Sequence, residues 1–233
     1  LFEVKWDGYR GLAYLDNNTT TLRSRNLTDL TAKFPELSRL HRLVNRLPAI
    51  LDGEIVVLQG GKPCFAALQA RRRGNISTEI SPASAVFVVF DVLYTHGESV
   101  MHIPLIDRKE LLQNMVSEDE KTLILSRYIY KEGRAYYEAC VREGLEGVVA
   151  KELKSPYQPG RRSNSWQKFR HTMEADLVIC GFQAGVGGRT LGALILGSYR
   201  DGELIYRGKV GTGFTEQEAL NLLVLLKPLA VDE

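Results

Sequence analysis

The 233-residue sequence predicts an α+β fold in which antiparallel sheets are flanked by helices and a smaller β-rich part follows. Apolar, β-branched segments alternate with segments of helical period over most of the chain, whereas the last 61 residues hold 10 of the 21 glycines. The charge changes at the same point. Residues 173–233 carry five basic and eight acidic side chains, and the rest carries 25 basic and 20 acidic ones. We therefore expect two domains, residues 1–172 and 173–233.

The first domain opens with signals for a hairpin and then a helix. Strand-like residues 11–15 and 20–24 flank the segment from Asp16 to Asn18, which is typical of a tight turn. Apolar side chains then recur at helical spacing and predict an amphipathic helix that ends at Pro48. These apolar residues are Phe34, Leu37, Leu40, Val44 and Leu47.

The other elements of this domain follow from composition and from glycine and proline. The predicted strands are residues 50–58, 86–93, 147–151 and 166–170. The predicted helices are residues 105–115 and 132–143. Gly144 ends the second helix. Residues 154–165 contain two prolines and have no regular period, so we expect a loop there.

The second domain predicts three strands and one helix. The strands are residues 177–182, 193–200 and 204–210. Asp201 and Gly202 form a hairpin signal between the last two strands. Thr215 and Glu218 have the spacing of a capping box, and Pro228 stops the helix that follows. This combination is typical of part of a small barrel.

Composition excludes several classes of protein. No apolar run approaches the roughly 20 residues that a membrane-spanning helix needs, and the N-terminus has no signal-peptide pattern. The three cysteines, Cys64, Cys140 and Cys180, cannot form a disulfide framework, so we expect a reducing compartment such as the cytoplasm. The chain lacks an initiator methionine and opens on a motif-like stretch, which indicates a fragment of a longer protein.

The first candidate for chemistry is Lys5, in the stretch from Glu3 to Arg10. An apolar neighbourhood followed by the turn at Asp7 would place its amine at a strand end, facing a cleft. A nucleophilic lysine must be uncharged, and partial burial and neighbouring cations favour that form. Taken alone, the octapeptide fits an ordinary surface lysine beside a turn equally well.

Two later strands carry further candidates. Glu146 and Lys151 lie at the two ends of one short apolar strand, and a carboxylate there suits Mg²⁺, which prefers oxygen ligands. Alternation places Trp166, Lys168 and Arg170 on one face of the next strand, where two cations could hold a phosphate. Solvated strand ends and a solvated basic loop are the alternatives, and for Glu146 and Lys151 alone we favour the former.

Three weaker features complete the set. Arg25 follows a strand and could face a phosphate or sugar, although a plain turn fits as well. The acidic pair Asp52 and Glu54 interrupts an apolar strand, which is costly unless the carboxylates are paired or used. Phe90 could stack on a base, although a core position is the commoner fate of phenylalanine.

Together these motifs resemble those of the covalent nucleotidyltransferases, which comprise ATP-dependent DNA ligases, RNA ligases and mRNA capping enzymes. Residues 5–10 resemble motif I (K-x-D-G-x-R), and Ser24-Arg25-Asn26 resembles motif Ia of DNA ligases. Residues 90–94, 146–151 and 166–170 are similar to motifs III, IV and V. Residues 143–163 resemble the ligase domain of bacterial end-joining DNA ligases, which work with the Ku protein and are often fused to polymerase and nuclease modules.

The resemblance implies a nucleotidyltransferase (adenylation) domain followed by a partial OB-fold barrel, and an enzyme that joins broken or nicked double-stranded DNA. Lys5 would attack ATP and carry AMP, with Mg²⁺ or Mn²⁺ held by Glu146 and Glu54. The implied nucleotide-binding residues are Glu3, Arg10, Arg25, Glu54, Phe90, Lys151, Lys168 and Arg170. We further expect a monomer, associated with the nucleoid in the cytoplasm and with no membrane partner.

Two departures from the family pattern stand out. Arg170 occupies a motif V position that usually holds lysine, which keeps the charge but changes its geometry. Motif VI (R-x-D-K) is not found, so self-adenylation by this fragment could be impaired. The alternatives are an RNA ligase or capping-type enzyme, and a catalytically silent nucleic-acid-binding module that uses residues 154–171 and the arginines at 71–73.

Overall fold

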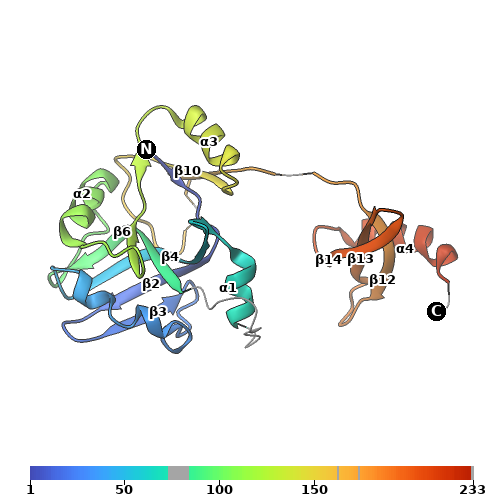
Figure 1. The fold of residues 1–233 in the computed structure, drawn as a ribbon, viewed down its shortest axis with the longest axis horizontal. Coiled ribbons are helices and arrows are strands. Elements are labelled where there is room, and N and C mark those ends of the chain that lie inside the picture. Colours follow the sequence, from blue (N-terminus) through green and yellow to red (C-terminus); the bar gives the residue numbers. More distant parts are fainter. Residues whose placement is uncertain (73–83, 162, 173, 232–233) are drawn as a thin grey trace. The chain divides into compact units, whose positions relative to one another are not determined.

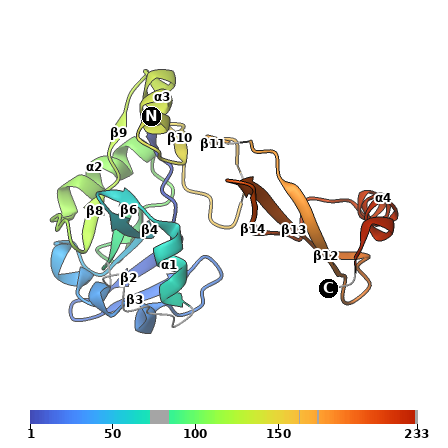
Figure 2. The ribbon, with the colours of Figure 1, turned by 45° about the vertical axis from the view of Figure 1, so that its right-hand side comes forward.

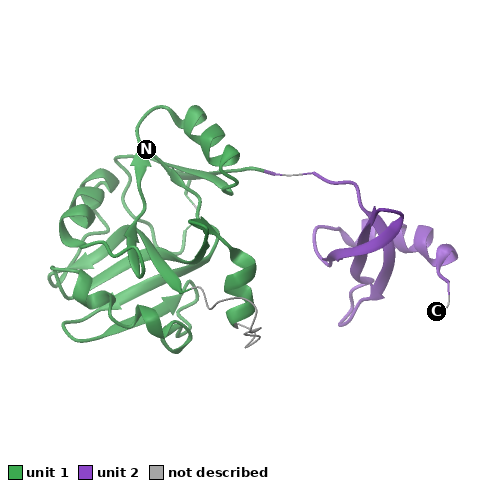
Figure 3. Cartoon of the chain, in the orientation of Figure 1, with its two compact units in different colours: residues 1–171 green, residues 172–233 purple. Residues whose placement is uncertain are grey.

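In a computed structural model, the chain divides into two compact units, residues 1–171 and 172–233 (Figure 3). The structure describes residues 1–72, 84–161, 163–172 and 174–231. Within these ranges, no helix is both long and apolar enough to cross a membrane. Each unit combines strands and helices, so the predicted α+β class is confirmed.

The larger sheet of the first unit has seven strands and holds most of its core. Its main path runs β3-β2-β4-β6-β7, with β5 paired to β4 and β8 paired in parallel to β6 (Figure 1). The strands are β2 (Tyr9–Leu15), β3 (Thr20–Ser24), β4 (Ala49–Gln59), β5 (Lys62–Pro63), β6 (Ala85–Thr95), β7 (Glu98–Ser99) and β8 (Leu123–Leu125). The long strand β6 is almost entirely buried, and most residues of β4 are buried as well.

A second, four-stranded antiparallel sheet has the order β11-β10-β1-β9. Its strands are β1 (Phe2–Val4), β9 (Tyr128–Ile129), β10 (Gly147–Lys151) and β11 (Trp166–Arg170). Residues 5–8 carry the chain from β1 of this sheet to β2 of the larger one. The predicted strands at 147–151 and 166–170 are confirmed, and they are neighbours in this sheet.

The described residues of this unit form the helices α1 (Phe65–Arg72), α2 (Leu105–Met115) and α3 (Gly133–Arg142). The last two confirm the predicted helices. The predicted helix over residues 34–47 is wrong, since three short 3₁₀ turns stand there: Thr31–Lys33, Pro35–Leu37 and Leu40–Leu43. Pro35 lacks the N–H that an α-helix interior would use, and none of the three turns has a side-chain cap.

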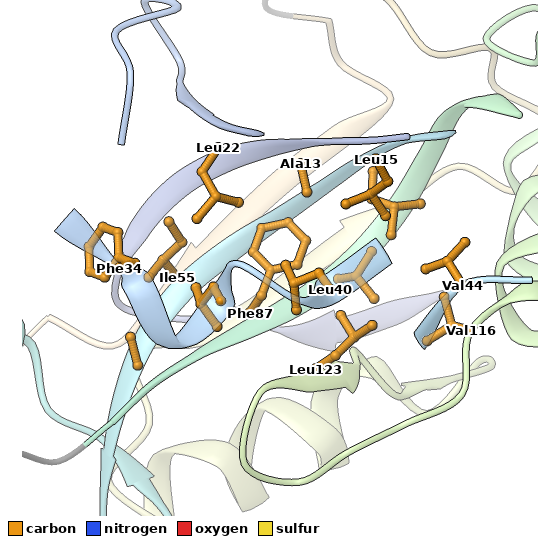
Figure 4. Close-up of a cluster of buried hydrophobic side chains, with 14 of the residues drawn as sticks. Ala13, Leu15, Leu22, Phe34, Leu40, Val44, Ile55, Phe87, Val116 and Leu123 are labelled. Carbon is orange, nitrogen blue, oxygen red and sulfur yellow. The ribbon is translucent and has the colours of Figure 1, made fainter. Parts of the chain in front are cut away.

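The periodic apolar residues nevertheless build the core. Phe34, Leu37, Leu40 and Val44 are all buried and pack against the large sheet. Figure 4 shows Phe34 and Leu40 within the same cluster as Phe87, and Val44 beside Val116. Spacing therefore identified the buried face correctly, although the backbone reaches that face through successive 3₁₀ turns.

A buried ion pair fixes α2 to the large sheet. The guanidinium of Arg108 donates from Nε and Nη2 to the carboxylate of Asp91 on β6, at 2.8 and 3.0 Å, and both side chains are fully buried. Its Nη1 donates to the carbonyls of Ile103 (2.6 Å) and Ser155 (3.1 Å), which ties the loop after β10 to the same point. Burial raises the pKa of Asp91, and Arg108 opposes that shift.

The second unit consists of a three-stranded sheet and one helix. The sheet has the order β12 (Val178–Ala184), β13 (Leu191–Arg200) and β14 (Glu203–Val210), and α4 (Glu216–Leu226) lies against it (Figure 2). Thr215 and Glu218 form the predicted capping box. Asp201 and Gly202 both have positive φ at the predicted hairpin turn.

Replacing Arg108 by methionine is expected to lower the free energy of unfolding by about 3–5 kcal/mol, because Asp91 would be left buried and unpaired. Urea denaturation measures this change. The double variant Arg108→Met, Asp91→Leu should regain part of the loss. The control Arg134→Met changes a side chain that is 94% exposed and should cost under about 0.5 kcal/mol. A loss for Arg108→Met as small as that of the control would contradict the structural role of the pair.

Candidate active site

Lys5 lies directly after β1, where its backbone N–H donates to the carbonyl of Gly147 at 2.9 Å. Its ammonium forms an ion pair with Oε2 of Glu146, and only 13% of the side chain is exposed. Arg170 approaches the other carboxylate oxygen, with 3.5 Å between Nε and Oε1. The small sheet therefore gathers three predicted site residues from β1, β10 and β11.

The ammonium of Lys5 is paired with a carboxylate, that of Glu146. We expected cations beside this amine that would favour its neutral form, and the side chain that contacts it is an acid instead. Cations do lie close by. Partial burial lowers the pKa of Lys168, and the positive charges of Lys5 and Arg10 lower it further. The amine thus lies between an acidic partner and a group of positive charges.

Arg10 on β2 holds the buried carboxylate of Asp52 on β4 with two hydrogen bonds, Nε to Oδ1 at 3.0 Å and Nη2 to Oδ2 at 2.6 Å. The hydroxyl of Tyr157, from the loop after β10, donates to the same Oδ2 at 2.7 Å. Nη2 of Arg10 also lies 3.2 Å from that hydroxyl. Both carboxylate oxygens of Asp52 therefore accept hydrogen bonds, which offsets the cost of burying this acid in an apolar strand. The same bonds orient Arg10.

Glu54 lies beside this group, opposite Arg10 in the pairing of β2 with β4. Burial raises its pKa to about 8, and Asp52 adds to the shift while Arg10, Lys5 and Lys168 oppose it. The close approach of the chain at Gly8 contributes to this burial. A Cβ there would lie 2.3 Å from the Ile55 carbonyl oxygen and 2.9 Å from Cγ of Glu54, so only glycine fits at this position.

Aromatic rings from both sheets meet around Lys151. Phe90 on β6 and Trp166 on β11 make an edge-to-face contact with ring centroids 5.9 Å apart. Nζ of Lys151 lies 4.0 Å from the Trp166 ring centroid and 4.5 Å from that of Phe90. The guanidinium of Arg10 lies 5.6 Å from the Phe90 ring. Phe90 is buried, and its ring faces cationic groups as well as the core.

Glu3 is a buried carboxylate at the back of this cluster. Its Oε2 accepts from Lys151 Nζ at 2.9 Å and from the hydroxyl of Ser126 at 3.2 Å, while Oε1 forms an ion pair with Lys109. Burial raises the pKa of Glu3, but Lys151 and Lys109 outweigh burial and hold the pKa below its usual value. Glu3 is therefore an ionised acceptor.

Not every predicted residue joins this group. Arg25, in the turn after β3, is exposed and makes no hydrogen bond or ion pair with the described part of the chain. In the 71–73 run, Arg71 pairs with Glu36 at 2.7 Å, and position 73 lies outside the described residues. Glu146 and Lys151 bind different partners, as expected for opposite ends of one strand.

Tyr157 and Lys109 are not among the site residues that the sequence predicts, although both contact them. Tyr157 stands in a stretch quoted for its likeness to end-joining ligases, and this is the only signal that could have selected it. Lys109 follows Arg108 in a helix, and two adjacent basic residues there predict a solvated face. Their burial results from contacts with residues far away in the sequence, which the spacing of apolar residues does not predict.

Comparisons with known proteins identify the family of this chain. A family model described as "ATP dependent DNA ligase domain" matches residues 1–170, and one described as "ATP dependent DNA ligase C terminal region" matches residues 187–233. The first covers well over half of the chain. The chain belongs to the ATP-dependent DNA ligase family. The resemblance inferred from the motifs is thereby confirmed.

Relatives of this ligase-family chain include "Multifunctional non-homologous end joining DNA repair protein LigD" of Mycobacterium tuberculosis. It is 38% identical over 235 residues, which cover 100% of this chain and 30% of the relative. "DNA ligase" of Thermococcus fumicolans is 36% identical over 245 residues, covering 100% of this chain and 44% of the relative. The chain thus spans less than half the length of these two relatives.

Solved structures show the same fold. "Mycobacterial DNA ligase D complexed with ATP and MES" is 36% identical with a TM-score of 0.65, and the match covers 100% of this chain and 73% of that one. "Crystal Structure of the Ligase Domain from M. tuberculosis LigD" has a TM-score of 0.62 at the same identity and coverage. The chlorella virus DNA ligase-adenylate, at 18% identity and a TM-score of 0.52, shares the fold.

Glu54→Gln is expected to be more stable than the wild type, by an amount that grows with pH. The pKa of Glu54 is raised from 4.5 to about 8, so between these values the unfolded chain ionises Glu54 while the folded chain keeps it protonated. The wild type therefore loses stability as pH rises through this window, and the glutamine variant does not. Above about pH 8 the difference between the two should stay constant.

Urea denaturation of both variants at several pH values measures this difference. Glu138→Gln, at a carboxylate that is 54% exposed, serves as the control and should show no such trend. A Glu54→Gln difference that is the same at every pH would contradict the buried, protonated state of Glu54.

Proposed function

We propose that this chain is the catalytic core of an ATP-dependent DNA ligase that acts in end-joining repair. The observation that carries the proposal is the position of Lys5, which directly follows β1, is paired with Glu146 and lies near Arg10 and Lys168. The family and the relatives named above support the same reaction. One of those relatives is a multifunctional end-joining repair protein, and one solved neighbour is complexed with ATP.

In the first step, the lone pair of the Lys5 amine attacks the α-phosphorus of ATP. A P–N bond forms, the bond from the α-phosphorus to the bridging oxygen breaks, and pyrophosphate leaves with the electron pair. The amine must first lose a proton and separate from Glu146. Lys168 and Arg170 lie on the same face of β11 and would neutralise charge on the phosphate.

The later steps also transfer phosphoryl groups. AMP passes from Lys5 to the 5′-phosphate of the DNA, and the 3′-hydroxyl then displaces AMP and closes the strand. Both steps place negative charge near the same cations, so the positions of Arg10, Lys168 and Arg170 are the main contribution of this chain. Phe90, Trp166 and Lys151 offer aromatic and cationic surface for a nucleotide base and its phosphates.

The carboxylates present fit a divalent metal such as Mg²⁺ or Mn²⁺. Mg²⁺ is commonly held by one or two carboxylates together with substrate phosphates, and Glu146 and Glu54 carry hard oxygen atoms near Lys5. Glu54 would give up its proton on binding the metal. Within the described residues, no cluster of three or more His, Cys, Asp or Glu forms a ready-made metal cage. The metal would neutralise phosphate charge during attack and departure.

The wider role belongs to this proposal as well. The larger unit would be the nucleotidyltransferase domain and the smaller one part of an OB fold, in keeping with the match of residues 187–233 to a ligase C-terminal region. Because the chain spans 30% of the mycobacterial relative, fused polymerase and nuclease modules and a Ku partner are further parts of the proposal. So are a monomeric state and a cytoplasmic, nucleoid-associated location.

Incubation of the chain with Mg²⁺ and ATP labelled on its α-phosphate is expected to give a labelled protein, and Lys5→Ala should reduce the label to background because no other amine has this position. Lys33→Ala, at an exposed lysine, is the control and should label normally. Label that survives Lys5→Ala would overturn the assignment of the nucleophile.

Two further arms separate the alternatives. Unlabelled GTP that competes as well as ATP, or sealing of nicked RNA in preference to nicked DNA, would support the RNA ligase or capping-type reading. A salt-sensitive gel shift on DNA with no labelling at all would support the silent binding module.

A further inference from the structure

Lys109 on α2 is a buried ammonium group that takes no direct part in the proposed reaction. Its side chain is 2% exposed. Nζ donates to the backbone carbonyl of Phe90 at 2.6 Å, forms an ion pair with Oε1 of Glu3 and lies 5.6 Å from the ring centroid of Tyr128. One amine thereby connects α2 with the large sheet through β6 and with the small sheet through β1 and β9.

The groups that Lys109 holds are those that face the proposed nucleotide site. The Phe90 carbonyl belongs to the residue whose ring contacts Trp166. Glu3 in turn binds Nζ of Lys151, which lies against both of these rings. Movement of Lys109 would therefore release Phe90, Glu3 and Lys151 together.

Stability alone does not account for a lysine at this position. Burial lowers the pKa of Lys109 to about 8, although Glu3 opposes this shift. Keeping this amine charged near neutral pH therefore costs free energy of folding. Apolar side chains of similar size often serve equally well or better where only packing is required. A charged group retained at such a position fits a requirement for a fixed geometry.

We propose that Lys109 is a positioning residue for nucleotide binding, which orders Phe90, Glu3 and Lys151 without touching the nucleotide. This inference rests on the proposed function, because it takes those three residues as the nucleotide-binding surface. The role is confined to affinity. Lys109 contacts neither Lys5 nor Glu146, so the rate of lysyl-AMP formation at saturating ATP should depend little on it.

The protonation of Lys109 provides a readout that a general packing role would not move. The groups facing its amine are Glu3 on β1, Lys151 on β10, Asp91 on β6 and Tyr128 on β9. As pH rises past about 8, Lys109 loses its proton, and Glu3 loses one of its two lysine partners and keeps Lys151. Affinity for ATP should therefore weaken on the alkaline side of this value.

The experiment compares the wild-type chain with Lys109→Met, Lys109→Arg and the exposed control Lys33→Met. Isothermal titration with ATP in the presence of EDTA measures Kd from near-neutral to alkaline pH, and single-turnover labelling with Mg²⁺ measures the rate at saturating ATP. Loss of a buried, charge-assisted contact predicts about a tenfold rise in Kd for Lys109→Met near neutral pH, with a rate within about threefold of wild type. Lys109→Arg stays charged, so its Kd should rise less on the alkaline side than that of the wild type, and the part of the rise that remains belongs to other groups such as Lys168.

Several results would overturn the inference. A folded Lys109→Met variant that binds ATP as the control does, or that loses rate at saturation as severely as affinity, removes the positioning role. If the variants do not fold, the wild-type titration decides, and a Kd that does not weaken above about pH 8 is the contrary result. A wild-type chain that binds no ATP would contradict the proposed function and this inference together, whereas normal ATP binding with an unaffected Lys109→Met contradicts this inference alone.

Discussion

Two buried ion pairs join the elements of the first unit. The ionised carboxylate of Glu3 forms one with Lys109 and the other with Lys151. Three elements meet there: β1 and β10 of the small sheet, and α2, which packs against β6 of the large sheet. A charge at such depth is tolerated only with close partners, because its desolvation is expensive. These ion pairs fix the position of the small sheet relative to the large sheet. Because Lys5 follows Glu3 by only two residues, they also fix the backbone near Lys5.

Near these ion pairs, the site contains charged groups whose partners do not fully balance them. Arg10 is committed to Asp52, and Lys5 to Glu146, while packing and neighbouring cations lower the pKa of Lys168. Glu54 is half-buried and its pKa is raised to about 8. Binding of an anion and a cation together would offset such unbalanced charges. Such a balance is what a site for a metal-bound polyphosphate requires.

The sequence predicted the strands of this site well. A short run with adjacent valines, as in residues 147–151, and alternating side chains, as in residues 166–170, are both typical of strands. The strands at 147–151 and 166–170 and the helix at 105–115 were found at their bounds. The helix expected over residues 34–47 was wrong because apolar spacing reports which face is buried, and a series of 3₁₀ turns containing Pro35 satisfies the same pattern.

Long-range partners account for what the sequence could not predict. Asp52 was recognised as costly, but its partners Arg10 and Tyr157 are 42 and 105 residues away. Lys109 carried no signal, since its partners Glu3 and Phe90 are brought to it by the packing of α2. The motifs named the residues that would meet the substrate, whereas the residues that hold them in place became evident only in three dimensions.

A crystal structure of the chain with a non-hydrolysable ATP analogue and Mg²⁺ would show whether Lys5 faces the α-phosphorus. We expect the nucleotide between the two sheets of the first unit, against Phe90, with Glu3 still bound by Lys109. We also expect that Lys5 has left Glu146 and that its Nζ lies within about 3.5 Å of the α-phosphorus. A nucleotide bound elsewhere on the chain, or an occupied site with Lys5 turned away from the phosphate, would contradict the role proposed for Lys5.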